Sequence, residues 1–221
     1  MCGRYSFVPS PIQITEELAD IEKPDELPVR YNIAPTQQAL VITNDAPGQL
    51  QALQWGLIPH WSRDGANGGK LINARMEGLA DKPSFRLPFR RRRCLVPADS
   101  FYEWRTELPK RKIPYRIFRQ DGQLMFFAGL WDEWRDGDGV KRTFTIITTS
   151  PSPDVEPLHD RMPVILTDPG ARQRWLEPIE PEEALELLQT PREGLLTWYR
   201  VSEQLNSPMN EKPELHERVN E

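Results

Sequence analysis

Short runs of hydrophobic residues, broken by turn residues, dominate the pattern along the chain. Runs rich in β-branched and aromatic residues, which are typical of strands, occupy residues 38–43, 94–99, 113–119, 124–131 and 142–150. Gly, Pro and Asp separate these runs, and the Asp-Gly pairs at 121–122 and within 136–139 are typical of hairpin turns. The pattern predicts a largely antiparallel β structure with short connections.

Helical spacing of apolar residues is confined to three stretches, at residues 9–20, 168–177 and 181–188. Asp168 and Pro181 suit the N-cap and the first turn of the second and third stretch. The 22 prolines are scattered through the chain at roughly twice the usual frequency. Because proline disrupts helix interiors, they leave little room for long helices.

We therefore expect one domain over residues 1–221. Its core would be a curved antiparallel sheet or a barrel, with short helices at the periphery. From about residue 204 onward the chain is polar, and we expect a mobile tail there.

Charge is distributed unevenly along the chain. The net charge is −5, yet residues 82–119 hold 12 Lys and Arg against 3 Asp and Glu, a local +9, so the remainder carries −14. This uneven distribution of charge permits an anionic partner in spite of the negative net charge. No run approaches 18 apolar residues and the first residues are not those of a signal peptide, so we expect a cytoplasmic protein without a membrane partner. The two cysteines lack metal-ligand spacing, so no metal and no other cofactor is expected.

Cys2 follows the first Met, and a small second residue favours removal of that Met. The exposed residue would then carry both an α-amine, with a usual pKa of about 8, and a thiol, with a usual pKa of about 8.5. An aldehyde is the natural electrophile for this pair, because amine attack gives a Schiff base and thiol attack closes a thiazolidine ring. N-terminal-nucleophile glutamine amidotransferases also start Met-Cys-Gly, but the match stops after those three residues. An incidental second residue is the other interpretation.

Three further positions carry side chains suited to acid–base or anion chemistry. His159 lies in the sequence His-Asp-Arg-Met-Pro, where Arg161 supplies an anion-binding guanidinium; a surface His beside an ion pair is the alternative. Asn73 and Arg75 alternate, so an extended segment would project both to one face, toward a sugar and a phosphate or toward buried backbone groups. Glu103 lies between Tyr102 and Trp104, where partial desolvation would raise its pKa toward use as a general acid, unless it is a plain edge-strand Glu.

Two other features admit a binding role and a structural one. Residues 90–93 are four consecutive arginines, which form either a solvated face or an anion patch. Trp61 would stack on a base if it is exposed and would belong to the core if it is buried.

Seven segments, in order, resemble the SOS-response-associated peptidase (SRAP) family, also called abasic-site processing proteins. They are MCGRY, RYNIAPTQ (30–37), WGLIPHW (55–61), INAR (72–75), RCLVPADSFYEW (93–104), FAGLWD (127–132) and HDRMPVIL (159–166). The resemblance covers nearly the whole chain. The loop between Trp61 and Asn73 departs from it, because it lacks a second stacking tryptophan.

The resemblance implies an α+β fold on an open, barrel-like β structure. It also implies an enzyme of the DNA damage response that recognises abasic sites in single-stranded DNA and links to them covalently, with peptidase and lyase activities attached to the family. On the matching positions Cys2 would be the nucleophile, Glu103 the proton donor and acceptor, Asn73 a contact to the abasic site and His159 a stabiliser of the opened sugar. The implied DNA contacts are Arg4, Asn32, Trp61, Arg75 and Arg161.

Two other functions stay open from the sequence. One is a cysteine peptidase that acts on proteins, with Cys2 paired with His159. The other is a non-covalent single-strand binder that uses only the arginines and aromatic residues. The sequence does not define the oligomeric state, and we expect a monomer.

Overall fold

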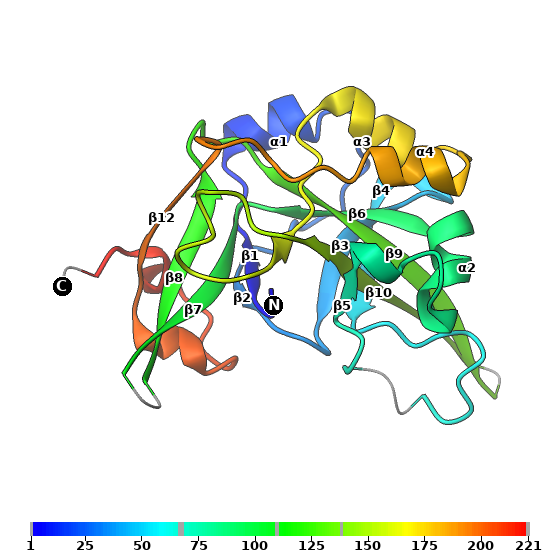
Figure 1. Ribbon diagram of the computed structural model, residues 1–221, viewed down its shortest axis with the longest axis horizontal. Helices are drawn as coiled ribbons and strands as arrows, with labels where there is room; N and C mark the ends of the chain where they lie inside the picture. The colour runs from blue at the N-terminus through cyan, green and yellow to red at the C-terminus, as the bar shows by residue number, and fades with distance from the viewer. Residues whose placement is uncertain (1, 66–68, 109–110, 138, 220–221) are drawn as a thin grey trace.

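The computed structural model describes residues 2–65, 69–108, 111–137 and 139–219, and its strands form two β units (Figure 1). The first unit is an antiparallel sheet with the strand order β12-β8-β7-β1-β2. Its strands are β1 (Tyr5–Phe7), β2 (Arg30–Ile33), β7 (Ser100–Leu108), β8 (Arg111–Arg119) and β12 (Leu196–Arg200). This sheet carries the N-terminal residues.

The second unit is a closed, mixed barrel. Its strands are β3 (Gln38–Thr43), β4 (Ala46–Trp55), β6 (Arg93–Ala98), β9 (Met125–Asp136) and β10 (Gly139–Thr149). Strand β10 pairs with β9 and, in parallel, with β4, which closes the ring β10-β4-β3-β6-β9. Two short strands, β5 (Asn73–Arg75) and β11 (Met162–Pro163), add to β10.

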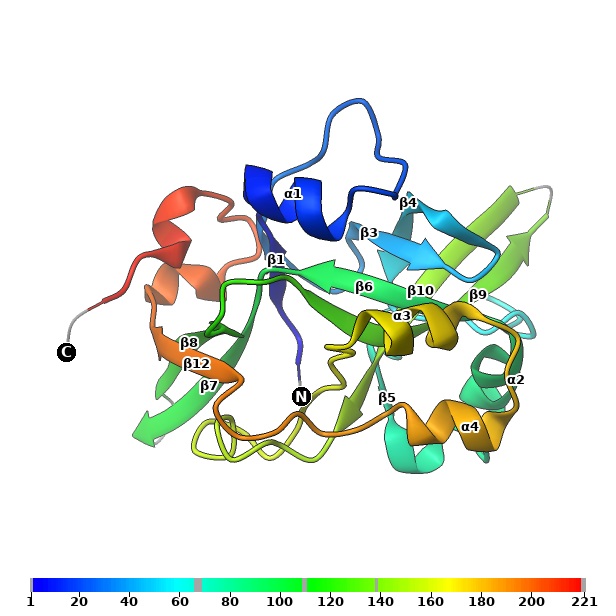
Figure 2. The same ribbon diagram turned by 90° about the horizontal axis from the view of Figure 1, so that it is seen from above.

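The expected α+β fold and its barrel-like core with short peripheral helices are confirmed. The helices are α1 (Pro11–Glu17), α2 (Pro83–Arg91), α3 (Pro169–Leu176) and α4 (Pro181–Glu186). Single 3-10 turns occupy Met76–Gly78 (η1), Glu203–Asn206 (η2) and Pro213–His216 (η3). Helices α1 and α3 lie side by side over the barrel, and α2 lies at its far end (Figures 1 and 2).

Of the two hairpin turns predicted at Asp-Gly pairs, one is present in the structure and the other is not. Strands β9 and β10 form the expected hairpin, with Asp136 opposite Gly139, although residue 138 lies outside the described residues. The turn at 121–122 is not a hairpin, because β8 belongs to the antiparallel sheet and β9 to the barrel. Gly122 has φ 74°, which suits a turn that redirects the chain between the two units.

Aromatic side chains join the two units in one core. The ring centroid of Tyr5, from the antiparallel sheet, lies 5.2 Å from the ring centroid of Trp55 and 6.0 Å from that of Phe127. Trp55 and Phe127 both belong to the barrel. All three side chains are buried. Burial of such rings contributes strongly to stability, so β1 is fixed against the barrel and the residues just before it are held in place.

Candidate active site

Strand β1 places Cys2 at the junction of the two β units. The strand pairs with β2 on one side and with β7 on the other, and the carbonyl of Arg4 accepts a hydrogen bond of 3.0 Å from the amide of Tyr102. The Cys2 side chain is buried, with its Sγ 3.8 Å from that same carbonyl. Met1, whose removal the sequence predicts, lies outside the described residues.

Asn73 lies in β5 and holds the backbone of Cys2. Its Nδ2 donates a hydrogen bond of 2.7 Å to the Cys2 carbonyl oxygen. Its Oδ1 has no hydrogen-bond partner among the described residues, so it remains able to accept one from a ligand. Ala74 is buried and Arg75 is exposed, as the expected alternation along an extended segment requires.

Glu103 is a buried carboxyl group on β7, opposite Tyr115 of β8. Burial, with a smaller contribution from the negative charge of Asp160, raises its pKa to about 7. The pKa is raised as expected, but Tyr102 and Trp104, as the adjacent residues of β7, project to the opposite face of the strand, so the cause is burial by other parts of the fold. A carboxyl group with this pKa exists in both protonation states near neutral pH, as a general acid–base group requires.

His159 lies beside Glu103, with its Nε2 3.8 Å from a carboxylate oxygen of that residue. Its Nδ1 lies 3.0 Å from the backbone amide nitrogen of Arg161 and also contacts the carboxylate of Asp160. Burial lowers the pKa of His159 and outweighs the opposing effect of Asp160, whose carboxylate lies 2.8 Å from Nδ1. The lowered pKa favours the neutral imidazole, and its Nε2 is directed at Glu103.

The Cys2 thiol is held in its protonated form. Burial, and secondarily the negative charge of Glu103, raise the pKa of this thiol well above its usual value. A cysteine that attacks as a preformed thiolate needs the opposite environment, with a cation that lowers the pKa. The site therefore favours chemistry in which another group attacks first and the thiol gives up its proton later.

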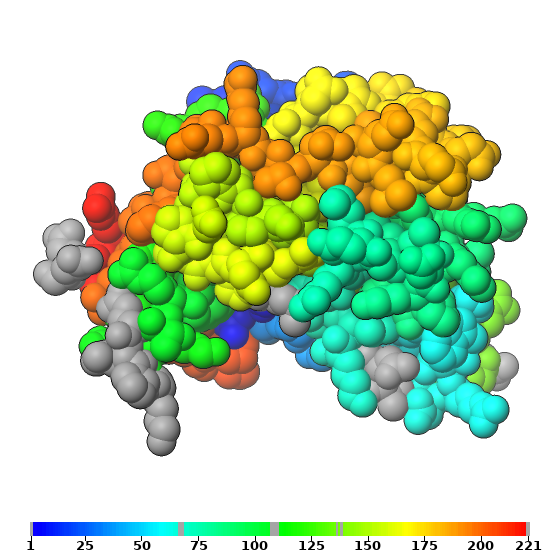
Figure 3. Space-filling model, in the orientation of Figure 1, coloured from blue at the N-terminus to red at the C-terminus, as the bar shows by residue number. Residues whose placement is uncertain are grey.

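A cleft of about 570 Å³ opens beside this group. Its lining residues are Arg4, Glu103, Trp104, Arg111, Lys112, His159, Glu203 and Asn206. In Figure 3 the N-terminal residues, in dark blue, are visible in a recess below the yellow-green loop that carries His159. Sequence reasoning missed Trp104, Arg111 and Lys112 as individual residues, although the local positive charge of residues 82–119 was the signal for the last two.

Arg4 reaches this cleft but is also tied to the C-terminal segment. Its guanidinium donates to Oδ1 of Asn32 at 2.6 Å and to the carbonyl of Leu205 at 2.8 Å, and it lies over the ring of Trp104. Asn32 itself is buried, and its amide donates to carbonyls of the same segment, including that of Asn210 at 2.8 Å. The expected direct DNA contact by Asn32 does not fit this burial, and the geometry gives it a positioning role instead.

The polar segment from residue 204 onward packs against the antiparallel sheet. Leu205 and Leu215 are buried there with Tyr102 and Val201. The hydroxyl of Tyr199 donates to the carbonyl of His216 at 2.6 Å. These contacts pack the segment around Asn32. The mobility expected for the tail from about residue 204 stays a prediction.

The other expected DNA contacts lie in different surroundings. Arg75 is exposed, whereas both terminal nitrogens of Arg161 bind the carboxylate of Glu77, at 2.6 and 3.1 Å. Trp61 is 49% exposed, which excludes the core interpretation of this residue. Arg161 can contact a phosphate only if Glu77 shares or releases it.

The four consecutive arginines do not form one solvated face. Arg93 is buried, where it donates to the carbonyls of Phe89 and Trp175. Arg92 is paired with the buried carboxylate of Asp132. Only Arg90 and Arg91 are exposed, so half of this run is structural.

The described residues contain no group of three or more His, Cys, Asp and Glu side chains arranged to hold a metal ion. Within the same residues, no helix has the length and apolar character needed to cross a membrane.

The fold and the site define a class of protein in which a cysteine at the second position is held beside an amide, a carboxyl group and an imidazole at the edge of a mixed barrel. The chain belongs to the family described as SOS response associated peptidase (SRAP), whose model matches residues 1–208. It is 45% identical to the abasic site processing protein YoqW of Bacillus subtilis, over 98% of this chain and 99% of YoqW. It is 30% identical to the abasic site processing protein YedK of Escherichia coli, over 99% of this chain and 100% of YedK.

The fold agrees with this membership. A crystal structure of a protein from Bacteroides thetaiotaomicron superposes with a TM-score of 0.86 at 29% identity, over 99% of this chain and 100% of that chain. The resemblance found in the seven sequence segments is thus confirmed over the whole fold.

Proposed function

We propose that this protein processes abasic sites in single-stranded DNA by forming a covalent link through Cys2. Family membership and the printed names of the relatives, abasic site processing proteins, support the substrate. The observation that carries the proposal is the position of Cys2, whose carbonyl is held by Asn73 beside the Glu103 carboxyl. Cys2 must be the first residue of the mature chain for this chemistry.

The electrophile is the open form of an abasic deoxyribose, which is an aldehyde. The Cys2 α-amine attacks the aldehyde carbon, and loss of one water leaves a protonated Schiff base. The Cys2 sulfur then bonds to the same carbon, the thiol proton passes to a base, and the C=N electron pair returns to nitrogen. The product is a thiazolidine. One aldehyde and one aminothiol combine with release of one water, and nothing is oxidised or reduced.

Glu103 is suited to move the protons in these steps. Its pKa of about 7 allows it to protonate the departing hydroxyl as an acid and to accept the thiol proton as a base. The neutral His159, whose Nε2 lies next to Glu103, is suited to form a hydrogen bond with the opened sugar. Asn73 positions Cys2 and offers its Oδ1 to the lesion.

Positively charged side chains support DNA as the ligand. Arg4, Arg111 and Lys112 line the cleft, and Arg75 is exposed two residues from Asn73. Such groups bind the phosphate backbone, and an unpaired strand lets the lesion reach a recessed site.

The peptidase function is less well supported by the same geometry. A cysteine peptidase needs a thiol with a lowered pKa next to a histidine base. Here burial, and secondarily the negative charge of Glu103, raise the pKa of the Cys2 thiol. A free α-amine, which a peptidase does not need, is required by the crosslinking function.

A crosslinking assay on denaturing gels tests the proposal. A single-stranded oligonucleotide with one abasic site should give a stable adduct with the wild type, whereas a tetrahydrofuran analogue, which has no aldehyde, should give none. Cys2→Ala keeps the α-amine, so it should give an adduct only after borohydride reduction of its Schiff base. A stable, unreduced adduct with Cys2→Ala would contradict the thiazolidine, and equal binding without any adduct would favour a non-covalent binder.

A further inference from the structure

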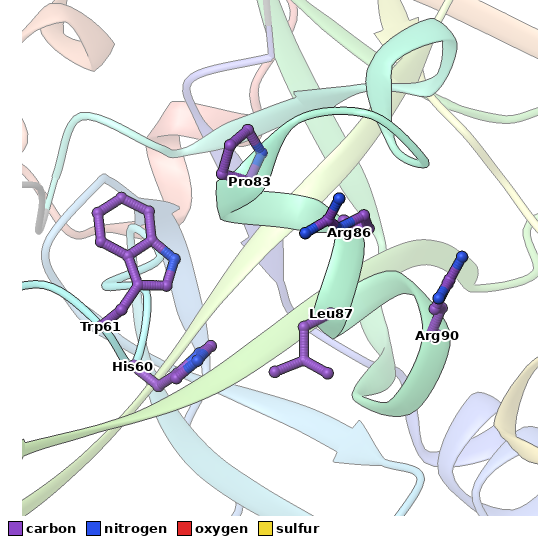
Figure 4. A pocket seen from close by; sticks show the side chains of 6 residues that line it. All are labelled: His60, Trp61, Pro83, Arg86, Leu87 and Arg90. Atoms are coloured by element: carbon purple, nitrogen blue, oxygen red, sulfur yellow. The ribbon is translucent and has the colours of Figure 1, made fainter.

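A second cleft, of about 680 Å³, lies away from Cys2, between helix α2 and the loop that follows β4 (Figure 4). His60 and Trp61 of that loop form one wall, and Pro83, Arg86, Leu87 and Arg90 of α2 form the other. None of these six lining residues is acidic. The cleft therefore combines an aromatic surface with positive charge, which is the composition of a nucleotide-binding groove.

The two arginines of α2 are available to a ligand. Arg86 and Arg90 are four residues apart, so they lie on the same face of the helix, and both are exposed. Within the part of the chain that the structure describes, neither guanidinium has a hydrogen-bond or ion-pair partner. By contrast, the neighbouring Arg92 is already paired with Asp132.

The opposite wall is held in a defined geometry. The carboxylate of Asp132, which is buried, accepts from the His60 backbone amide at 2.9 Å and lies 3.1 Å from Nδ1 of the same residue. This contact fixes the imidazole and leaves Nε2 as the ring nitrogen available to a ligand. Because Arg92 binds the same carboxylate, the negative charge of Asp132 is neutralised and does not oppose an anion in the cleft.

The cleft is connected to the Cys2 site through β5. The loop with His60 and Trp61 leads into β5, and η1 and α2 follow it, so both walls are joined to the strand that carries Asn73 and Arg75. In both ribbon views β5 lies between the N-terminus and α2 (Figures 1 and 2). A strand bound at Cys2 and passing the exposed Arg75 would therefore continue toward this cleft.

We propose that the cleft binds a nucleotide of the same DNA strand, beyond the lesion. The contacts proposed here are those of Arg86 and Arg90 with backbone phosphates, next to the half-exposed Trp61, whose stacking on a base the family resemblance already implies. This site extends the path beyond the residues of the Cys2 cleft and rests on the proposed function for the identity of the strand. The α2 arginines set affinity for longer strands and take no part in the chemistry at Cys2.

Non-covalent binding of tetrahydrofuran-containing strands tests this proposal independently of crosslinking. Two lengths, about 4 and about 16 nucleotides, bracket the usual site sizes of single-strand grooves. For the longer strand, the double variant Arg86→Gln/Arg90→Gln should flatten the salt dependence of log K by about 1.4, which is about 0.7 for each lost phosphate contact. Trp61→Ala should weaken binding of the same strand about 10-fold. For the shorter strand centred on the lesion, affinity should not change in the double variant.

A matched control and a competitor complete the experiment. Arg192→Gln removes an exposed arginine from the loop before β12 and should leave both strands unaffected. Gln was chosen because its helix propensity is close to that of Arg. Equal melting temperatures of the double variant and the wild type would show that the variant is folded. An unchanged salt slope for the longer strand would overturn the proposal. It would also be overturned if a free mononucleotide bound the wild type through these arginines with no dependence on strand length, since the cleft would then serve a soluble ligand.

The proposal and the proposed function can fail separately. If strands bind with the expected slopes but no adduct forms with an aldehyde-containing strand, the function at Cys2 is wrong and the second cleft remains a DNA site. If adducts form normally and the double variant changes nothing, the function stands and the second cleft is not part of the path.

Discussion

The side-chain amide of Asn73 donates a hydrogen bond of 2.7 Å to the backbone carbonyl of Cys2. This contact links β5, which is paired with the barrel strand β10, to the residues before β1 in the antiparallel sheet. Cys2 is thus fixed from both β units. A nucleophile held in this way needs little further ordering when the aldehyde arrives.

Asn73→Ala should slow crosslink formation about 10- to 100-fold, because misplacement of a reacting group by about 1 Å can cost up to about 10²-fold. Single-turnover rates at saturating DNA measure it. Arg75→Ala, two residues along the same strand, is the control and should weaken DNA binding without lowering the saturated rate. Equal saturated rates for Asn73→Ala and wild type would show that Cys2 is held without this amide.

Glu103→Gln should slow crosslinking by roughly 10²-fold while affinity for the DNA is nearly retained, because it removes a titrating carboxyl group and keeps the shape. The rate of the wild type should titrate near pH 7, following the raised pKa of Glu103, and the variant should lose that titration. His159→Ala should also slow the reaction more than it weakens binding. Anisotropy binding beside single-turnover rates distinguishes these effects, and proportional losses in both would mean that the two residues only hold the DNA.

The raised pKa of Glu103 also makes a prediction about folding. Between the usual value of 4.5 and the folded-state value of about 7, the native protein binds more protons than the unfolded chain. Stability from this group is therefore present below pH 4.5 and is lost as pH rises to about 7. We expect the free energy of unfolding of Glu103→Gln, relative to that of the wild type, to rise by up to about 3 kcal/mol between pH 5 and pH 8. Chemical denaturation at both pH values measures this difference. A difference that does not vary with pH would mean that the carboxyl group is not desolvated.

The arginines near β5 should differ in their contribution to DNA binding. Arg75→Ala should reduce the salt slope for single-stranded DNA by about 0.7, because this exposed side chain is free to meet a phosphate. Arg161→Ala should have a smaller effect, since its guanidinium already binds Glu77. Glu77→Gln should then strengthen binding at low salt by releasing Arg161. Weaker binding by Glu77→Gln would show that this ion pair positions Arg161 for the DNA.

Local patterns predicted five of the twelve strands in the described residues, β3, β6, β8, β9 and β10, and three of the helices, because alternation and turn residues act over a few residues. The run at 38–43 coincides with β3, and α3 begins after its expected cap Asp168, whose side chain accepts from the amide of Ala171. Helix α2 was missed because Pro83 and Pro88 argue against a helix. Pro83 in fact occupies the first turn, where no amide donor is needed, and the buried Pro88 and Phe89 compensate by packing on the core.

The sequence singled out Cys2, Asn73, Glu103 and His159, but few of their contacts could be predicted from it. The proximity of Glu103 to His159 depends on folding of segments 56 residues apart. The burial of Asn32 depends on the C-terminal segment, and that of Arg93 depends on α3, so neither could be read from nearby residues. Long-range contacts of this kind leave no local signal.

The central claim is that the α-amine of Cys2 takes part in the link, and intact-mass spectrometry tests it most directly. One preparation begins at Cys2, and a second retains Met1, so that the Cys2 nitrogen is an amide. Each is incubated with single-stranded DNA that contains one abasic site. The account predicts an adduct with the summed masses less one water for the first preparation and no such adduct for the second. An adduct of equal yield from the protein that retains Met1 would contradict it.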